Sequence, residues 1–584
     1  MSGRLDPVTL EVIRNVLPAV ANEMAADLQR TSYNMMIYEV RDFCAALVDV
    51  KGRLISQNVG GVSHFVADLG VIIEDAVARY GVDGFAPGDV LITNHQRVAG
   101  QHLNNIVIFV PFFFEERLIC FSMVRAHWID VGGMSTGFGA GATVRDPWLE
   151  GLQLDQLKIY QAGKLDEQLH RVIKDNIRFP ESSLGDMRSQ IAACRLAVRQ
   201  LEELFNKYSN QTMLAAIDHI FAETEEKCRK TVTQIPDGIY EAESVYDDDS
   251  VALGEPIRIH AKVVVEGDHM TIDLSGCSSY RKGGINSRTL AAARVAYKAL
   301  TAPLEAVNEG SFGALKVVIP EGNIMMAPFP APMASWSLIV PTVVDTIFKA
   351  LAPAMKDRIP AGHHALLGGS IVFFGTNPQS NKNFVLQSLE GGGWGGRPFE
   401  DGESGTVTVC QGDVRNAAIE AIELKCPVMI EQRALRPDSG GAGKYRGGFG
   451  IEMKIRNFVE GRWNLARPRR QKDPPWGLWG GRAGAIAQFL LKRPNETEFK
   501  AVDSVMQLVP KDSQVIAQTG GGGGWGSPLE RKPEAVRWDV IEGLISKSAA
   551  EKEYGVVLNA NHSIDQTATA TLRQRIAQPI TAAR

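Results

Sequence analysis

A chain of 584 residues is too long for one hydrophobic core, so about two to four structural regions are expected. With 45% hydrophobic and 22% charged residues the composition is that of a globular protein, and a formal net charge of -5 argues against nucleic acid or an anionic membrane as a partner, because both attract basic faces. The 7 cysteines form no C-x-x-C pair and the N-terminus lacks a signal-peptide pattern, which predicts reduced thiols and a cytoplasmic location.

The chain opens with a predicted amphipathic helix. Asp6-Pro7 has the form of a helix cap followed by a first-turn proline, and apolar residues then recur at spacings of three and four. These residues are Leu10, Ile13, Leu17, Val20, Met24 and Leu28. Pro18 removes one backbone donor inside this pattern, so we expect a kink there or two shorter helices.

The patterns that follow predict an α+β fold, large and divided into several regions, with antiparallel sheets and a helical segment. Short β-type runs fill 42–130, helical periodicity covers 187–230, and polar and apolar residues alternate over 257–274. A helix near 290–299 then gives way to glycine-rich loops. We therefore expect an N-terminal α+β region with the candidate site over 1–180, a helical segment over 181–235, an antiparallel β region over 236–282, and a mixed α/β region rich in glycine loops over 283–584.

Two histidines stand near the ends of a predicted hairpin in the stretch GQHLNNIVIFVPFFFEERLICFSMVRAHWIDVGG. If Glu115-Glu116 form a two-residue loop, His102 lies opposite Ile129, and His127 shares the parity of Ile129. Both imidazoles then project from the same face, within reach of one ion. A loop one residue longer would reverse this parity.

An amide and two carboxylates are the candidates for the other ligands of such an ion. Asn105 shares a site with His102 only if 102–105 form a turn, which the Asn104-Asn105 pair favours. Zinc and manganese sites usually include a carboxylate, for which Asp42 and Asp130 are the nearest candidates in the sequence. The alternative is that the two histidines are hydrogen-bonded structural groups of the core, which is the commoner role of such pairs.

Other site motifs are incomplete or lack the context that they need. Gly443-Lys444 is followed by Tyr445, so no phosphate-binding G-x-x-x-x-G-K-[ST] loop forms there, and no G-x-G-x-x-G run stands between a clear strand and a helix with a following acidic residue. The glycine clusters indicate tight turns and close packing instead. His95 and the pair His363-His364 are further histidines to consider as ligands.

Several stretches together resemble the hydantoinase B/oxoprolinase family. They are DPVTLEVIRN, VRDFCAALVD, PGDVLITN, GQHLNN, RAHWIDVGG, NIRFPESSLGDMRSQIAACR, ALRPDSGGAGKYRGGFG, DPPWGLWGG and GGGGWGSPLERKPEAVRWDVIEGLIS, and they span nearly the whole chain. The resemblance implies one subunit of a two-component, ATP-dependent enzyme. Its partner would be a hydantoinase A-type subunit that binds ATP and magnesium, in a heterotetramer of two plus two or a larger complex, which agrees with the missing phosphate loop.

The resemblance also implies a metal site, with zinc or manganese as the ion. Carried over to this chain, the ligands are Asp42, His102, Asn105 and His127. Asn105 departs from the family's aspartate, and the loss of one anionic charge should weaken the binding of a divalent ion. Two further departures are Asn94-His95-Gln96 in place of N-D-P and Trp128 in place of a histidine.

These departures leave the mechanism open. In one alternative, three retained ligands hold an ion that has an open position, and this ion would polarise a carbonyl or generate hydroxide. His95 would then replace the lost ligand. Alternatively the ion is gone and the imidazoles act as acid and base. His95 and Asp130 are the residues we assign to catalysis.

The function expected first is an ATP-dependent opening of a cyclic amide, such as a hydantoin, oxoproline or a lactam. The second interpretation is a ketone carboxylase subunit of the acetone or acetophenone carboxylase type, favoured by the altered ligands and by an aromatic Trp128 beside the pocket. In the third, the chain is a non-catalytic assembly partner with a decayed site.

Overall fold

The computed structural model describes residues 5–137, 141–365, 370–465, 470–502 and 506–577. Its helices and antiparallel sheets form the mixed α+β fold expected from the sequence. No described helix has the length and apolarity needed to cross a membrane.

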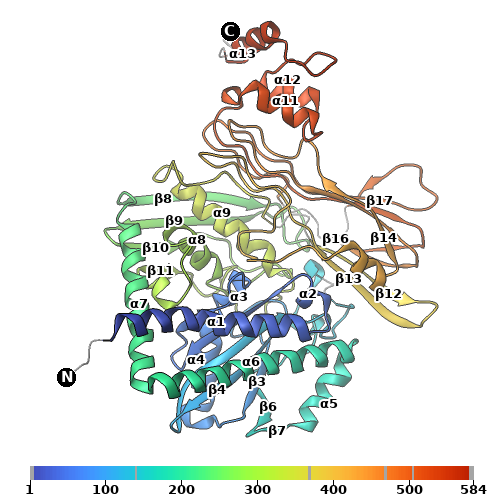
Figure 1. Cartoon of the computed structure of the whole chain (residues 1–584). Coiled ribbons are helices and arrows are strands. Elements are labelled where there is room, and N and C mark those ends of the chain that lie inside the picture. Colours follow the sequence, from blue (N-terminus) through green and yellow to red (C-terminus); the bar gives the residue numbers. More distant parts are fainter. Residues whose placement is uncertain (1–4, 138–140, 366–369, 466–469, 503–505, 578–584) are drawn as a thin grey trace.

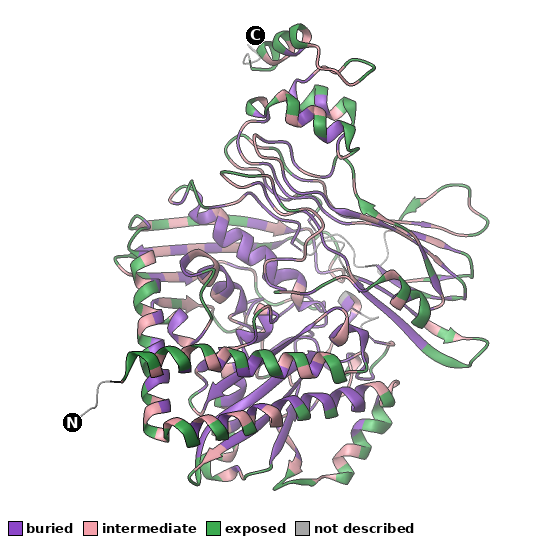
Figure 2. Cartoon of the chain, viewed as in Figure 1, coloured by how far each residue is buried: buried purple, intermediate pink, exposed green. Residues whose placement is uncertain are grey.

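The N-terminal part is a seven-stranded sheet with the strand order β2-β1-β5-β4-β3-β6-β7. Its strands are β1 (Phe43–Asp49), β2 (Leu54–Gln57), β3 (Val90–Thr93), β4 (Asn105–Phe114), β5 (Arg117–His127), β6 (Leu157–Gln161) and β7 (Lys164–Leu165). The central strands are buried on both faces, which explains their nearly continuous apolar sequences. Figure 2 shows these strands buried while the helices across them keep an exposed outer side.

Two long helices, α1 (Pro7–Thr31) and α6 (Pro180–Tyr208), lie side by side across one face of this sheet (Figure 1). Asp6 caps α1 as its sequence predicts, accepting from the Thr9 N–H. We expected either a kink at Pro18 or two shorter helices, and the second alternative is wrong, because α1 continues through Pro18 as one element. The buried stripe along the helix holds it against the sheet and outweighs one lost backbone hydrogen bond.

The remaining helices are shorter. They are α2 (Met35–Tyr38), α3 (Ser63–Val66), α4 (Leu69–Tyr80), α5 (Glu167–Asn176), α7 (Asn210–Val232), α8 (Ala291–Thr301), α9 (Ile339–Leu351), α10 (Ile419–Lys425), α11 (Pro533–Ile541), α12 (Lys547–Tyr554) and α13 (Gln566–Ala577). The C-terminal helices α11, α12 and α13 stand at the opposite end of the molecule from the N-terminal sheet (Figure 1).

A second sheet has the order β11-β10-β9-β8 and packs against α9. Its strands are β8 (Gly238–Tyr246), β9 (Ile257–Glu266), β10 (His269–Asp273) and β11 (Leu315–Val318). The first three strands pair antiparallel, whereas β11 pairs parallel with β10 after a crossover that contains α8. The sheet therefore extends past the boundary at residue 282, because periodicity within one strand cannot reveal a parallel partner that comes later in the chain.

Two further sheets form the C-terminal part, with the orders β13-β12-β16-β19 and β14-β15-β20-β17-β18. Their strands are β12 (Ser370–Asn377), β13 (Lys382–Leu389), β14 (Val428–Leu435), β15 (Ile451–Asn457), β16 (Gly461–Leu465), β17 (Gln488–Lys492), β18 (Lys500–Ala501), β19 (Met506–Val509) and β20 (Gln514–Gln518). One hydrophobic cluster runs from Met35 to Ala517, so the regions share a core.

The glycine clusters form extended segments packed backbone to backbone. A Cβ on Gly522 would lie 1.9 Å from the carbonyl oxygen of Trp394, and one on Gly393 would lie 1.9 Å from that of Gly448. The Gly441 N–H donates to the Gly522 carbonyl at 2.8 Å. Close packing is therefore what these glycines provide, since any side chain would separate the segments.

Candidate functional site

The hairpin of β4 and β5 carries the two histidines. Glu115 and Glu116 both have left-handed backbones, with φ of 50° and 63°, which confirms the two-residue loop. A bulge between Phe112 and Phe113 then shifts the register of the strands by one residue. As a result Asn105 pairs directly with His127 across the two strands.

A turn before β4 places His102 next to Asn105 and His127. The Asn105 N–H donates to the His102 carbonyl at 3.2 Å, and His102 Nε2 lies 2.9 Å from Asn105 Oδ1. The rings of His102 and His127 are 5.0 Å apart between centroids at an interplanar angle of 75°. The predicted proximity of the two imidazoles and the turn at 102–105 are thus both present.

Asp42 stands next to this pair, immediately before the neighbouring strand β1. Phe43 pairs with Ala126, and the His127 N–H donates to the Asp42 carbonyl at 3.1 Å, so Asp42, His127 and Asn105 form a row across the sheet. Burial raises the pKa of the Asp42 carboxyl to about 7. A carboxyl with this pKa exchanges protons near neutral pH.

The described residues do not present a complete set of metal ligands. No group of three or more His, Cys, Asp or Glu side chains in them is arranged to hold a metal ion. The Nε2 of His102 is also engaged by the Asn105 amide. A zinc or manganese ion held by Asp42, His102, Asn105 and His127 therefore stays a prediction.

The structure adds three residues to the site: His64 and Trp336 lie outside the stretches quoted for the family, whereas Arg125 is the first residue of RAHWIDVGG. His64 comes from α3, and its ring centroid lies 4.7 Å from that of Trp336. The ring of Trp336 is in turn 6.1 Å from that of His102. Arg125 lies two residues before His127 on β5, on the same face, and is buried. No sequence spacing links these residues, because α3, β5 and the segment before α9 meet only in the folded chain.

The three imidazoles, His64, His102 and His127, form a cluster of neutral rings. Burial, followed by the charge of Arg125, lowers the pKa of His64 to about 3. Burial and the neighbouring His127 hold the pKa of His102 well below its usual range, and burial lowers the pKa of His127 to about 4. At neutral pH each ring therefore has one nitrogen of donor type and one of acceptor type.

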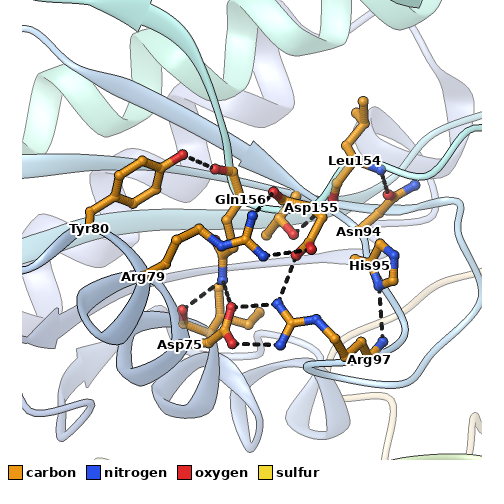
Figure 3. Close-up of polar contacts among 11 residues, drawn as sticks. Asp75, Arg79, Tyr80, Asn94, His95, Arg97, Leu154, Asp155 and Gln156 are labelled. Atoms are coloured by element: carbon orange, nitrogen blue, oxygen red, sulfur yellow. Dashed lines mark hydrogen bonds and ion pairs between the residues drawn. The ribbon is translucent and has the colours of Figure 1, made fainter. Parts of the chain in front are cut away.

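His95 lines a hollow that none of the three clustered histidines lines. Its Nδ1 accepts from the Arg97 N–H at 3.2 Å (Figure 3), and its ring centroid is 4.9 Å from that of Phe329. Arg97 belongs to an ion-pair network with Asp75 and Asp155. The structure does not bring His95 together with the histidine cluster, and its role as a replacement ligand or catalytic group stays a prediction.

Asp130 organises the loop that follows β5. Its carboxylate accepts from the backbone N–H groups of Gly132, Gly137 and Arg178, and pairs with the Arg178 guanidinium at 3.0 Å. With its side chain wholly buried, Asp130 holds two segments together. These contacts indicate a structural role, while the catalytic role expected from its place in the sequence stays a prediction.

Trp128 packs on the far face of the sheet, under α6. It belongs to the second core cluster, and its Nε1 donates to Gln190 Oε1 at 2.8 Å. The expectation that Trp128 lies beside the pocket is therefore wrong. Successive strand residues point to opposite faces, so a neighbour of His127 in sequence does not share its side.

The pair His363-His364 forms a separate buried group. His363 Nδ1 lies 2.8 Å from Asp345 Oδ1 of α9, and its backbone N–H donates to the same carboxylate. The carboxylate thereby fixes both the ring and the loop that carries it.

Comparison with known proteins decides the family. The family model for hydantoinase B/oxoprolinase matches residues 6–528. The chain belongs to this family. A relative from Pseudomonas sp. (strain NS671), described as a B-type subunit of a D-/L-hydantoinase, is 32% identical over 98% of both chains.

Two solved structures share the fold. The ATP-dependent caprolactamase of Pseudomonas jessenii superposes with a TM-score of 0.91 at 25% identity, covering 98% of this chain and 100% of that chain. A nucleotide-free acetone carboxylase superposes with a TM-score of 0.88 at 19% identity, covering 98% of this chain and 83% of that chain. The resemblance to the hydantoinase B family that the sequence motifs indicated is confirmed.

Proposed function

We propose that this chain is the ring-opening subunit of an ATP-dependent cyclic amidohydrolase. Its relatives support this choice: one is described as a hydantoinase subunit and another is an ATP-dependent caprolactamase, each matching nearly the whole chain. The observation that carries the proposal is the row of Asp42, His127 and Asn105 beside a second imidazole, His102, in a buried site.

The row contains groups suited to the hydrolysis of an amide. Asp42, with a pKa near 7, takes a proton from water as the water oxygen attacks the carbonyl carbon. Asp42 then passes the proton to the amide nitrogen of the substrate ring as the C–N bond breaks, which leaves a carboxylic acid and an amine. The neutral imidazoles of His102 and His127 hydrogen-bond the carbonyl and the water, and burial of the site excludes bulk solvent.

ATP would be used by a second subunit. The hydantoinase relative is itself described as a subunit, which supports a complex. We propose a hydantoinase A-type partner that holds ATP and magnesium, in a two-plus-two heterotetramer or larger assembly. The mass of the co-purified complex tests this stoichiometry.

The test of the function is an assay of the complex with ATP. The complex is offered a panel of hydantoins, oxoproline and lactams, and ring opening is followed with and without ATP. His102→Ala and His127→Ala should each lower turnover by roughly 100-fold or more. His219→Ala, at a surface histidine of α7, is the matched control and should retain activity.

Two other outcomes would overturn the proposal. Incorporation of labelled bicarbonate into a ketone, with no ring opening, would make the chain a carboxylase subunit. Unchanged turnover in both histidine variants would make it an assembly partner whose own site does no chemistry.

A further inference from the structure

Arg125 is a buried cation with unused hydrogen-bond donors. It lies on β5 with 2% of its surface exposed. Within the described residues, its Nε and Nη1 have no hydrogen-bond acceptor. Buried arginines normally have their donors satisfied, because a guanidinium leaves water at a large cost in free energy.

The nearby acidic residue does not use these donors. The Asp68 carboxylate lies close enough to interact with the charge of Arg125, but it accepts from Thr289 Oγ1 at 2.5 Å, the Leu290 N–H at 3.2 Å and Gln101 Nε2 at 3.4 Å. Asp68 therefore balances the charge of the guanidinium while its lone pairs serve other donors. The ring of Phe65, 5.4 Å from the Arg125 carbon Cζ, covers the guanidinium on one side.

Arg125 lies next to the histidine cluster. His64 and His102 both lie within range of its charge, and it shares a strand face with His127. The Nδ1 of His64 is a second buried polar atom without a partner among the described residues. Two unsatisfied polar groups from α3 and β5 thus lie beside the place proposed for ring opening.

We propose that Arg125 and His64 form an oxyanion-binding subsite next to the ring-opening groups. Its ligand presents carboxylate or phosphate oxygens, which accept from a guanidinium in charge-assisted hydrogen bonds. The ligand is then an anionic form of the reacting molecule: either a substrate that carries a carboxylate or one that has received a phosphate group. The identity of the reacting molecule rests on the proposed function. The existence of the anion site does not depend on that function.

The test is direct binding of small anions to the full chain, without partner or ATP. Calorimetric titrations use inorganic phosphate in one arm and acetate in the other, at constant ionic strength, with chloride as the reference. Saturable binding of phosphate alone identifies a phosphorylated ligand, binding of acetate alone identifies a carboxylate, and binding of both supports a site for either oxyanion. Binding of neither anion overturns the proposal.

Variants locate the bound anion. Arg125→Gln should weaken binding by about 10- to 100-fold, the range for one charge-assisted hydrogen bond. Arg199→Gln, at an exposed arginine of α6, is the matched control and should bind as the unaltered chain does. Equal binding by Arg125→Gln places the anion elsewhere and overturns the proposal.

A conservative variant is the control for a loss of binding that is caused by misfolding. Arg125→Lys keeps the charge, and its affinity for the anion should be lower than that of the unaltered chain but higher than that of Arg125→Gln. If Arg125→Gln does not fold, the comparison of Arg125→Lys with the unaltered chain decides, and equal affinity would overturn the role of the guanidinium. Because no turnover is measured, a chain that binds anions but opens no ring would refute the proposed function and leave the subsite in place.

Discussion

Replacing Asp42 with asparagine should stabilise the fold while lowering activity. The Asp42 carboxyl has a pKa of about 7 in the folded chain, against an ordinary value of 3.8. Between these two pH values the folded chain holds a proton that the unfolded chain has lost, so the free energy of unfolding falls as pH rises and the loss is complete above the folded pKa. An asparagine side chain does not titrate and escapes this loss.

The gain in the free energy of unfolding follows from the pH range between the two pKa values. About three pH units at about 1.4 kcal/mol per unit give an upper bound of roughly 4 kcal/mol. Local relaxation and the cost of burying the asparagine amide reduce the expected gain to about 2–4 kcal/mol at pH 8. At pH 4 the two chains should be nearly equal. Turnover of the complex should fall by roughly 100-fold or more, because the asparagine amide cannot accept the proton.

Urea denaturation between pH 4 and pH 8, with EDTA present, measures the difference. Asp83→Asn, at an exposed aspartate, is the matched control and should follow the unaltered chain. A D42N chain that is less stable at pH 8 would refute the burial argument, since the carboxylate would then have a stabilising partner. If the loss occurs only without EDTA, that partner is a metal ion.

Three other substitutions give distinct results. Asn105→Asp places a carboxylate where the amide oxygen lies 2.9 Å from His102 Nε2, so zinc or manganese content by elemental analysis should rise above that of the unaltered chain, and an unchanged content would contradict a metal role for this position. Asp130→Ala should cost about 3–5 kcal/mol in urea denaturation, because it removes the buried carboxylate that pairs with Arg178; a loss smaller than about 1 kcal/mol would argue against that clamp. Trp128→Phe should cost about 1–3 kcal/mol through loss of the bond to Gln190 and leave KM unchanged, whereas a changed KM would place Trp128 in the site after all.

The hairpin shows how a correct conclusion can follow from incomplete geometry. The left-handed pair Glu115-Glu116 was predictable, because two charged residues between apolar runs favour a tight loop. The bulge between Phe112 and Phe113 was not, since no residue type there requires it. It shifts the strands by one residue, and the turn at 102–105 restores His102 to the side of His127.

Local patterns in the sequence determined the class of fold, the capped first helix, the alternating strands of the second sheet and the family, because each depends on residues near one another in the chain or on short motifs. Only the tertiary structure decided which groups surround the two imidazoles. His64, Arg125 and Trp336 come from segments far apart in sequence, and burial, which sets the pKa values of Asp42 and the histidines, depends on the packing of the whole chain. The sequence determines which chemical groups the side chains carry, but the electrostatic environment of each group forms only when the chain folds.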